Sequence, residues 1–298
     1  MPEIKILIAP PGAGKTTWAM EYLQEHHDDT VYISSDETRK KLFGDETCQD
    51  DPGRVFGTMC SNAADALKKG QNVIYDATDM TRKSRRQIIN SVPAGTTVTA
   101  QIIWRSPPKC IVADKERTRT VGEHVIERMI RNFQAPYYDE GFDKIEWHLN
   151  VPIAFSPAVW YWHIQSLSEI PQDNPHHSMT VFEHDHATRD YLADRDADTG
   201  LLIAAKLHDV GKPYVKDFHN AKGEPTEIAH YYGHQGYSAW LSIPCLTYRP
   251  WQKYDTRKIC WLISNHMEPY MNTRYYRNLP PELKADLDLL HEADENAR

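Results

Sequence analysis

Short apolar runs alternate with amphipathic helical stretches along the first half of the chain. The apolar runs are rich in β-branched residues and lie at 4–8, 30–34, 72–75 and 98–104. The helical stretches lie at 16–26, 55–69, 82–90 and, with an interruption near Val121 and Gly122, at 107–133. This order of strands and helices predicts a parallel sheet with helices on both faces. Ligands of such sheets bind at the carboxyl ends of the strands.

The pattern breaks between residues 146 and 180, where four prolines punctuate a stretch rich in Trp, His and Ser. Beyond it the spacing of apolar residues is helical, and no alternation with a period of two is sustained. The predicted helices lie at 181–194, 199–208, 230–241, 255–265 and 281–295. We therefore expect an α/β domain over 1–150, followed by an all-α domain over 151–298.

Composition supports a two-domain enzyme of the cytoplasm. A chain of 298 residues with 40% hydrophobic content is long enough for two cores. It has no apolar run long enough to span a bilayer, and the first strand begins too early to leave room for a signal peptide. The five cysteines form no C-x-x-C pair and are expected to be reduced thiols. A net charge of −8 argues against a broad nucleic-acid-coating surface, although it leaves room for a local basic groove.

A phosphate-binding loop follows the first apolar run. Residues 9–17 read A-P-P-G-A-G-K-T-T, which fits G-x-x-x-x-G-K-[ST] with Ala9 in place of the first Gly. Its small residues let backbone amides surround an anion, while Lys15 reaches the outer phosphates and the Thr16 hydroxyl can bind Mg²⁺. The loop predicts ATP and Mg²⁺ as cofactors. The expected nucleotide-binding residues are Gly12, Ala13, Gly14, Lys15, Thr16 and Thr17.

Two acidic residues follow predicted strands. Asp36 can accept a proton from an incoming hydroxyl, and Arg39, one helical turn later, can hold a phosphate beside that hydroxyl. Asp36 can also be a helix N-cap. Asp76 can bind Mg²⁺ through water, position the acceptor or cap the next helix.

Two basic stretches have two interpretations each. Residues 82–86 form either a solvated helix face or a contact with a phosphate backbone. Residues 115–119 form either a lid that neutralises charge on the γ-phosphate or an ordinary charged surface.

From residue 4 to about 147, the chain resembles the P-loop 5′-polynucleotide kinases and their small-kinase relatives. The resemblance is carried by the phosphate loop, the Asp36-x-x-Arg39 pair, the basic stretch, and the segments 74–78, 121–129 and 140–143. It implies that Asp36 is the general base and that Arg39 binds the phosphate next to the 5′-OH.

The same resemblance implies that Arg117 and Arg119 engage the ATP phosphates. The chain departs from the family pattern at two places. Asp79 stands where the pattern has Asn, and Gly122 stands where it has Pro.

The second half contains candidate metal ligands. His208 and Asp209 are adjacent at the end of an apolar helix, and together they offer a nitrogen and an anionic oxygen to one ion. Mixed ligands of this kind suit Mn²⁺, Ni²⁺, Co²⁺, Fe²⁺ or Zn²⁺. Four further residues on separate predicted helices can converge on the same ion: His184, His234, His266 and Asp294.

The order His…His-Asp…His…His…Asp resembles the HD phosphohydrolase superfamily, and more closely the HD domain of bacterial tRNA nucleotidyltransferases. The resemblance covers about 174–298 and rests on the segments 174–177, 181–184, 207–213 and 232–234. It implies four core ligands: His184, His208, Asp209 and Asp294. It further implies that His234 and His266 complete a second metal site or hold phosphate, and that Lys212 contacts a substrate phosphate. Within 174–177, His176 and His177 are expected to be structural.

These features predict a bifunctional nucleic-acid end-healing enzyme. The kinase part transfers the ATP γ-phosphate to a polynucleotide 5′-OH, and the HD part hydrolyses 2′,3′-cyclic or 3′ phosphate ends. RNA is favoured over DNA, because RNA breakage often leaves these ends. The alternative is a nucleoside or nucleotide kinase fused to an HD nucleotidase, which the acidity and the lack of an aromatic stacking run favour. A purely regulatory nucleotide-binding protein is disfavoured, because binding alone needs no general base.

Overall fold

A computed structural model describes residues 1–174 and 178–297. His176 and His177 therefore lie outside the described part of the chain. The five cysteines are free thiols. Within the described ranges, no helix is both long enough and apolar enough to cross a lipid bilayer.

The chain forms two compact units. The first comprises Met1–Ile126 and Pro136–Val151, and the second comprises Glu127–Ala135 and the chain from Pro152 onward. A short internal segment thus belongs to the second unit although the chain on either side of it belongs to the first. We describe each unit by itself.

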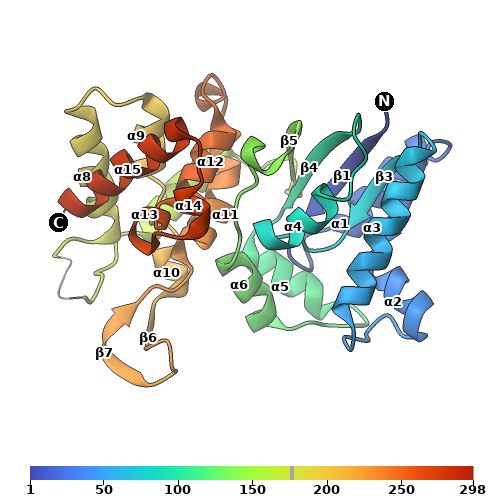
Figure 1. Ribbon diagram of the computed structural model, residues 1–298. Helices are drawn as coiled ribbons and strands as arrows, with labels where there is room; N and C mark the ends of the chain where they lie inside the picture. The colour runs from blue at the N-terminus through green and yellow to red at the C-terminus, as the bar shows by residue number, and fades with distance from the viewer. Residues whose placement is uncertain (175–177, 298) are drawn as a thin grey trace. The chain divides into compact units, whose positions relative to one another are not determined.

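The first unit is built on a parallel five-stranded sheet flanked by helices (Figure 1). Its strands are β1 (Glu3–Ile8), β2 (Thr30–Ser34), β3 (Asn72–Asp76), β4 (Thr97–Trp104) and β5 (Lys144–Leu149). They lie in the spatial order β2-β3-β1-β4-β5. The helices are α1 (Lys15–His26), α2 (Ser35–Phe43), α3 (Pro52–Lys68), α4 (Arg82–Ile89), α5 (Pro107–Lys115) and the 3₁₀ helix η1 (Tyr138–Glu140). The helix α6 (Glu123–Arg131) begins in this unit and ends in the second. The prediction of an α/β P-loop fold with a parallel sheet is confirmed.

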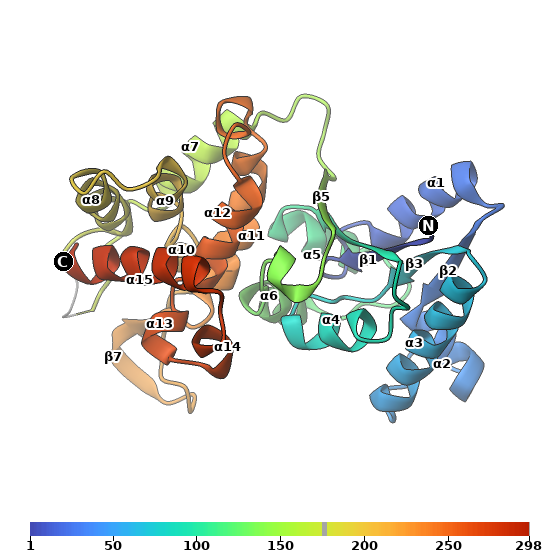
Figure 2. The same ribbon diagram turned by 45° about the horizontal axis from the view of Figure 1, so that its top comes forward.

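The apolar pattern explains the position of each strand. β1 is central and its side chains are covered on both faces, so that Ile4, Ile6 and Ile8 are fully buried. Figure 2 shows α1 on one face of the sheet and α3 and α4 on the other. β5 was not predicted, because it is an edge strand with mostly half-exposed side chains and lacks a continuous apolar run. All five carboxyl ends share one edge of the sheet, where the candidate phosphate site lies.

The second unit is mainly helical. Its helices are α7 (Pro157–Leu167), α8 (Val181–Ala193), α9 (Thr199–Ala205), α10 (Lys212–Val215), α11 (His234–Leu246), α12 (Thr256–Asn265), α13 (Glu268–Met271), α14 (Arg274–Arg277), α15 (Pro281–Asn296) and the 3₁₀ helix η2 (Arg249–Trp251). α11 forms the core and contacts α7, α10 and α12, and its Trp240 and Leu241 are fully buried. α8 packs beside α15, as both views show.

Two features of this unit depart from the all-helical expectation. An antiparallel hairpin pairs β6 (Asp217–His219) with β7 (Pro225–His230). Its strands are largely exposed, so they lack the apolar alternation that would have predicted them. The helix predicted from residue 230 begins instead at His234, because Gly233 adopts a φ of 79°. A Cβ at that position would lie 2.7 Å from Cβ of Arg131, so only glycine fits.

Candidate phosphate-transfer site and candidate metal centre

The loop between β1 and α1 has the backbone geometry of an anion cradle. Gly12 and Gly14 have φ values of 76° and 102°, which turn the chain tightly before α1 begins at Lys15. The Lys15 ammonium donates to the carbonyl oxygens of Ala9 at 2.8 Å and Pro10 at 3.3 Å. The amide groups at the start of α1 point toward the loop, where the helix dipole favours an anion.

Two side chains from the neighbouring strand ends hold this loop. Asn150, just after β5, donates from Nδ2 to the carbonyl oxygen of Ala13 at 2.9 Å. Arg105, just after β4, donates from Nη1 to the carbonyl oxygen of Gly12 at 3.0 Å. A Cβ at Gly14 would lie 2.6 Å from Asn150 Nδ2, so a glycine is needed there for space as well as for φ. The sequence analysis predicted neither Asn150 nor Arg105 as a residue that holds the loop.

The candidate magnesium corner lies at the first turn of α1. The side chains of Thr16 and Thr17 are exposed there. Thr16 Oγ1 donates to Asp76 Oδ2 at 3.4 Å, and the Tyr32 hydroxyl donates to the same oxygen at 2.6 Å. Asp76 is buried at the carboxyl end of β3. A hydroxyl and a carboxylate are oxygen ligands of the kind that Mg²⁺ prefers, so these residues fit the ion.

The candidate acceptor site lies at the start of α2. The N-cap of this helix is Ser34, whose Oγ accepts from the amide of Glu37 at 3.2 Å. Asp36 is therefore not the N-cap of α2, which was one of the two roles that the sequence allowed. Its Oδ1 accepts from Arg39 Nη1 at 3.1 Å and lies 3.9 Å from Arg119 Nη1. Half of the Asp36 side chain is exposed, so an incoming hydroxyl can reach the carboxylate.

Arg117 and Arg119, the two candidate lid arginines, interact with different parts of the first unit. Burial lowers the pKa of Lys15, an effect that Asp76 opposes and the charge of Arg117 increases. The positive charge of Arg117 thus acts on Lys15 in the phosphate loop. Arg119 donates from Nη1 to the carbonyl oxygen of Glu46 at 3.2 Å and so lies on the acceptor side. Both were expected to engage ATP phosphates, and that role stays a prediction for each.

The basic stretch on α4 is not a uniform solvated face. Arg85 is fully buried and forms a bidentate ion pair with Glu140, with N–O distances of 2.9 and 2.6 Å. Its Nη1 also donates to the carbonyl oxygen of Asp79 at 3.0 Å. Arg85 is thus a structural residue, and it ties the loop after β3 to the segment before β5.

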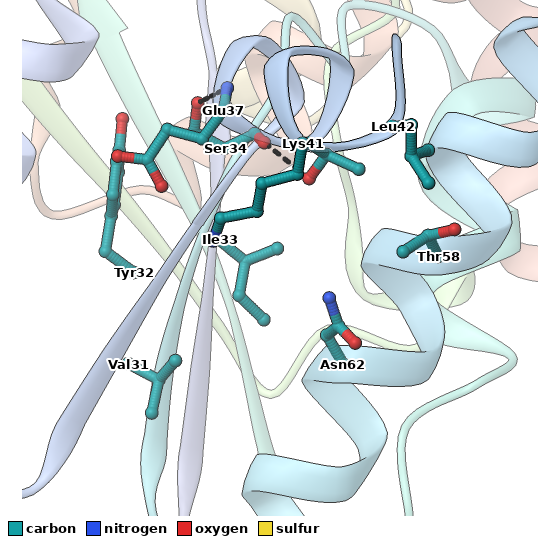
Figure 3. A pocket seen from close by; sticks show the side chains of 10 residues that line it. Val31, Tyr32, Ile33, Ser34, Glu37, Lys41, Leu42, Thr58 and Asn62 are labelled. Carbon is teal, nitrogen blue, oxygen red and sulfur yellow. Dashed lines mark hydrogen bonds between the residues drawn. The ribbon is translucent and has the colours of Figure 1, made fainter. Parts of the chain in front are cut away.

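A separate cavity of about 240 Å³ lies beside β2, between α2 and α3 (Figure 3). Val31 and Ile33 form its apolar side, and Lys41 and Asn62 lie across from them. The α2 residues that line the cavity are offset by about half a turn from Asp36. The cavity and the candidate acceptor site are therefore on different faces of α2.

In the second unit, the structure brings together all six predicted metal ligands, which come from α8, the turn after α9, the start of α11, the end of α12, and α15. Four of them have ligand atoms within 4.8 Å of one another: His184, His208, Asp209 and Asp294. Asp209, His234 and His266 form a second such group. Asp209 belongs to both groups, with Oδ2 3.5 Å from His208 Nε2 and Oδ1 3.2 Å from His234 Nε2.

All four imidazoles are oriented in the same way by the backbone. Their Nδ1 atoms lie 2.7 to 2.9 Å from carbonyl oxygens of Ala297, Ala205, Tyr231 and Ile263, for His184, His208, His234 and His266 respectively. With the proton on Nδ1, each Nε2 can offer a lone pair to a cation at the centre of the cluster. In the structure, His184 Nε2 lies 2.8 Å from Asp294 Oδ1, and the Nε2 atoms of His234 and His266 lie 3.0 Å apart. Within the described part of the chain, His208 Nε2 and Asp209 Oδ1 are buried without a hydrogen bond. These orphaned atoms fit a bound cation.

The charges in the cluster are strongly coupled. Burial alone would raise the pKa of Asp209, but Lys212 and His208 hold it well below its usual range. Burial lowers the pKa of His208, yet Asp209 and Asp185 together raise it to about 10. Burial lowers the pKa of His266 to about 3. Without a metal, the buried carboxylates are thus balanced by protonated His208, whose proton would leave when a cation binds.

Two further residues line the cluster. Lys212, expected to contact substrate phosphate, is buried with Nζ 2.5 Å from Asp209 Oδ2 and 2.8 Å from Gln172 Oε1. Its predicted role stays a prediction. Asp185, which we missed in the sequence, is fully buried with Oδ1 3.3 Å from His208 Nδ1. The one feature of the sequence that could have indicated Asp185 is that it directly follows His184.

The match to a family model lies mainly in the first unit. Residues 5–136 match the family described as an AAA domain, which is less than half of the chain. Together with the phosphate loop and the parallel sheet, this match identifies the first unit as a P-loop domain of the kinase type. No curated protein matches the sequence.

Solved structures resemble about half of the chain. A structure of the Pnkp1/Rnl/Hen1 RNA repair complex is 24% identical with a TM-score of 0.41, covering 48% of this chain and 46% of that one. A gluconokinase from Sinorhizobium meliloti 1021 is 16% identical with a TM-score of 0.37, covering 51% and 86%. A fungal RNA kinase is 18% identical with a TM-score of 0.36, covering 49% and 38%. The chain thus spans under half the length of the first and third of these structures.

Proposed function

We propose that the protein is a bifunctional enzyme that heals nucleic-acid ends, with RNA favoured over DNA. Its first unit transfers the γ-phosphate of ATP to a polynucleotide 5′-OH. Its second unit, a metal-dependent phosphohydrolase of the HD type, removes 2′,3′-cyclic or 3′ phosphates. The observation that carries the kinase half is the half-exposed Asp36 carboxylate, set between the guanidinium groups of Arg39 and Arg119 directly after the carboxyl end of β2.

In the proposed transfer, side chains of this protein remove the proton and stabilise the negative charge on the phosphates. Asp36 takes the proton of the 5′-OH as that oxygen attacks the γ-phosphorus, and the bond to the β-phosphate oxygen breaks to release ADP. Lys15 and Arg117 stabilise the charge on the phosphates, while Arg39 holds the phosphate next to the reacting hydroxyl. A positioned general base contributes roughly 10²- to 10⁴-fold to the rate of such a step.

The proposed hydrolysis rests on the four imidazoles with inward Nε2 atoms and on the shared carboxylate Asp209. A divalent transition metal held there supplies a polarised phosphoryl oxygen and a water of lowered pKa. The residues of the chain orient that ion and exclude bulk water, because His208 and Asp209 are almost fully buried. Lys212 neutralises Asp209 within the cluster.

A second candidate is a nucleoside or nucleotide kinase joined to a nucleotidase. The net charge of −8 favours it, because an acidic protein repels a polyanion more strongly than a small nucleoside. With a nucleoside as the acceptor, Arg39 beside Asp36 has no acceptor phosphate to bind.

An end-labelled RNA oligonucleotide with a 5′-OH and a 2′,3′-cyclic phosphate tests the proposal. It is incubated with ATP, Mg²⁺ and Mn²⁺ and with wild type, Lys15→Ala or Asp209→Ala. We expect phosphate gain at the 5′ end to fail only in Lys15→Ala, and phosphate loss at the 3′ end to fail only in Asp209→Ala. Matched controls are Lys68→Ala and Asp190→Ala, which change exposed residues on α3 and α8.

The outcomes separate the candidates. If neither end of the RNA changes while added nucleosides are phosphorylated, the small-molecule kinase replaces the end-healing enzyme. If Asp209→Ala also abolishes phosphate gain at the 5′ end, the assignment of the two activities to two units is wrong.

A further inference from the structure

Tyr32 lies next to the candidate magnesium ligands Thr16 and Asp76. It lies on β2, and the parallel register pairs it with Ile74, two residues before Asp76 on β3. Because side chains alternate along a strand, Tyr32, Ile74 and Asp76 lie on the same face of the sheet. Tyr32 also belongs to the residues that line the cavity beside α3, but Figure 3 shows its side chain on the opposite side of β2 from Val31 and Ile33.

Packing fixes the direction of the Tyr32 ring. The ring lies against a buried cluster of Leu7, Ala19 and Ile74, which α1 covers. Its hydroxyl emerges at the end of this cluster and donates to Asp76 Oδ2 at 2.6 Å. The hydrogen bond is therefore made by a side chain that has little freedom to turn elsewhere.

Asp76 Oδ2 accepts from two hydroxyl groups at once. The second donor is Thr16, at 3.4 Å. When the Thr16 proton points at Asp76, the lone pairs of Thr16 Oγ1 remain available for a cation. The second carboxylate oxygen of Asp76 remains available for the water ligands of the same cation. Tyr32 thus decides which oxygen of Asp76 faces Thr16.

We propose that Tyr32 is a positioning residue for Mg²⁺: its hydroxyl orients Asp76 so that Asp76 and Thr16 together bind the ion that accompanies ATP. This inference rests on the proposed kinase function, which requires a Mg²⁺–ATP complex. Residues that orient metal ligands in this way typically change metal affinity or activity by about 10- to 100-fold when removed.

The test is Tyr32→Phe in the full-length protein, because Phe keeps the ring in the cluster and removes only the hydroxyl. Tyr75→Phe is the matched control. Tyr75 is a buried tyrosine next to Asp76 in sequence, but its hydroxyl contacts the Cys60 thiol, at 3.9 Å. For each protein, ADP affinity is measured in EDTA, and Mn²⁺ affinity of the ADP complex is then measured by electron paramagnetic resonance.

We expect Tyr32→Phe to bind ADP normally in EDTA and to bind Mn²⁺ about 10- to 100-fold more weakly, with Tyr75→Phe like wild type. The Mg²⁺ concentration for half-maximal kinase rate should rise correspondingly, while the rate at saturating Mg²⁺ recovers. Unchanged Mn²⁺ affinity in Tyr32→Phe would overturn the inference, as would an equal loss of ADP affinity in EDTA, which indicates a merely structural role. The Mn²⁺ measurement needs no acceptor, so an error in the proposed acceptor would leave it intact.

Discussion

Asp79 makes the stability of the first unit depend on pH. It is 3% exposed, and in the described part of the chain its Oδ2 has no hydrogen-bond partner. Burial raises its pKa from 3.8 to about 7, although Arg85 and a hydrogen bond with Ser84 oppose the shift. Asp79 stands where the resembling kinases have Asn, so Asp79→Asn replaces the acid with a neutral group of the same shape.

The sign follows from which state holds the proton more tightly. Between pH 3.8 and about 7 the unfolded chain loses the Asp79 proton while the folded unit keeps it. The folded state therefore loses stability as pH rises through this window, and the loss is complete above it. A pKa shift of this size lowers the free energy of unfolding by about 4 kcal/mol in full. Roughly 2 to 3 kcal/mol of this loss falls between about pH 5 and pH 8.

Native-state hydrogen exchange of peptides from β1 and β3 measures the opening free energy of the first unit directly. We expect the opening free energy of Asp79→Asn, relative to that of wild type, to rise by roughly 2 to 3 kcal/mol between about pH 5 and pH 8. Other titrating groups cancel, because they are common to both proteins. A difference between the two proteins that does not change with pH would refute the reasoning, since the Asp79 carboxyl would then titrate as an exposed acid does.

Three further outcomes follow from contacts described above. Asn150→Ala removes the hydrogen bond to the Ala13 carbonyl and should weaken ADP binding about tenfold, as measured by calorimetry. An unchanged ADP affinity would contradict a role of Asn150 in shaping the loop. Glu140→Gln removes the carboxylate that pairs with the buried Arg85 and should lower the unfolding free energy of the first unit by about 3 kcal/mol, measured by denaturant titration. The double variant Arg85→Met, Glu140→Leu should recover most of that loss. Mn²⁺ at about 100 times its Kd should stabilise the second unit by about 2.7 kcal/mol, and Asp209→Ala should abolish this shift; a shift that persists would place the ion elsewhere.

Features encoded in consecutive residues could be predicted from the sequence. The phosphate loop is one continuous segment, and the five strands of the sheet include four that are apolar runs. His208 and Asp209 are adjacent, and the helical spacing around them is regular. Convergence of the other metal-binding candidates was an expectation from their order alone, and the structure brings their side chains together.

Contacts between distant residues could not be predicted. Asn150 and Ala13 are 137 positions apart, and Tyr32 and Asp76 are 44 apart, so no local pattern links them. The hairpin of β6 and β7 is exposed and lacks an apolar alternation. α7 was missed because its aromatic residues and flanking prolines resemble an irregular connection. For the distant pairs and for α7, the deciding interaction is tertiary packing, which overrides local propensity.

The path of the chain limits how the protein can be divided. Residues 127–135 belong to the second unit, where Phe133 packs edge-on against Trp240 and the amide of Ala135 donates to Ser264 Oγ at 3.0 Å. A protease cut after residue 151 would therefore leave this segment on the N-terminal fragment, and the C-terminal fragment alone would lack the ring contact with Trp240 and the hydrogen bond to Ser264. The two units are not interchangeable modules joined by one linker, because the chain passes between them three times.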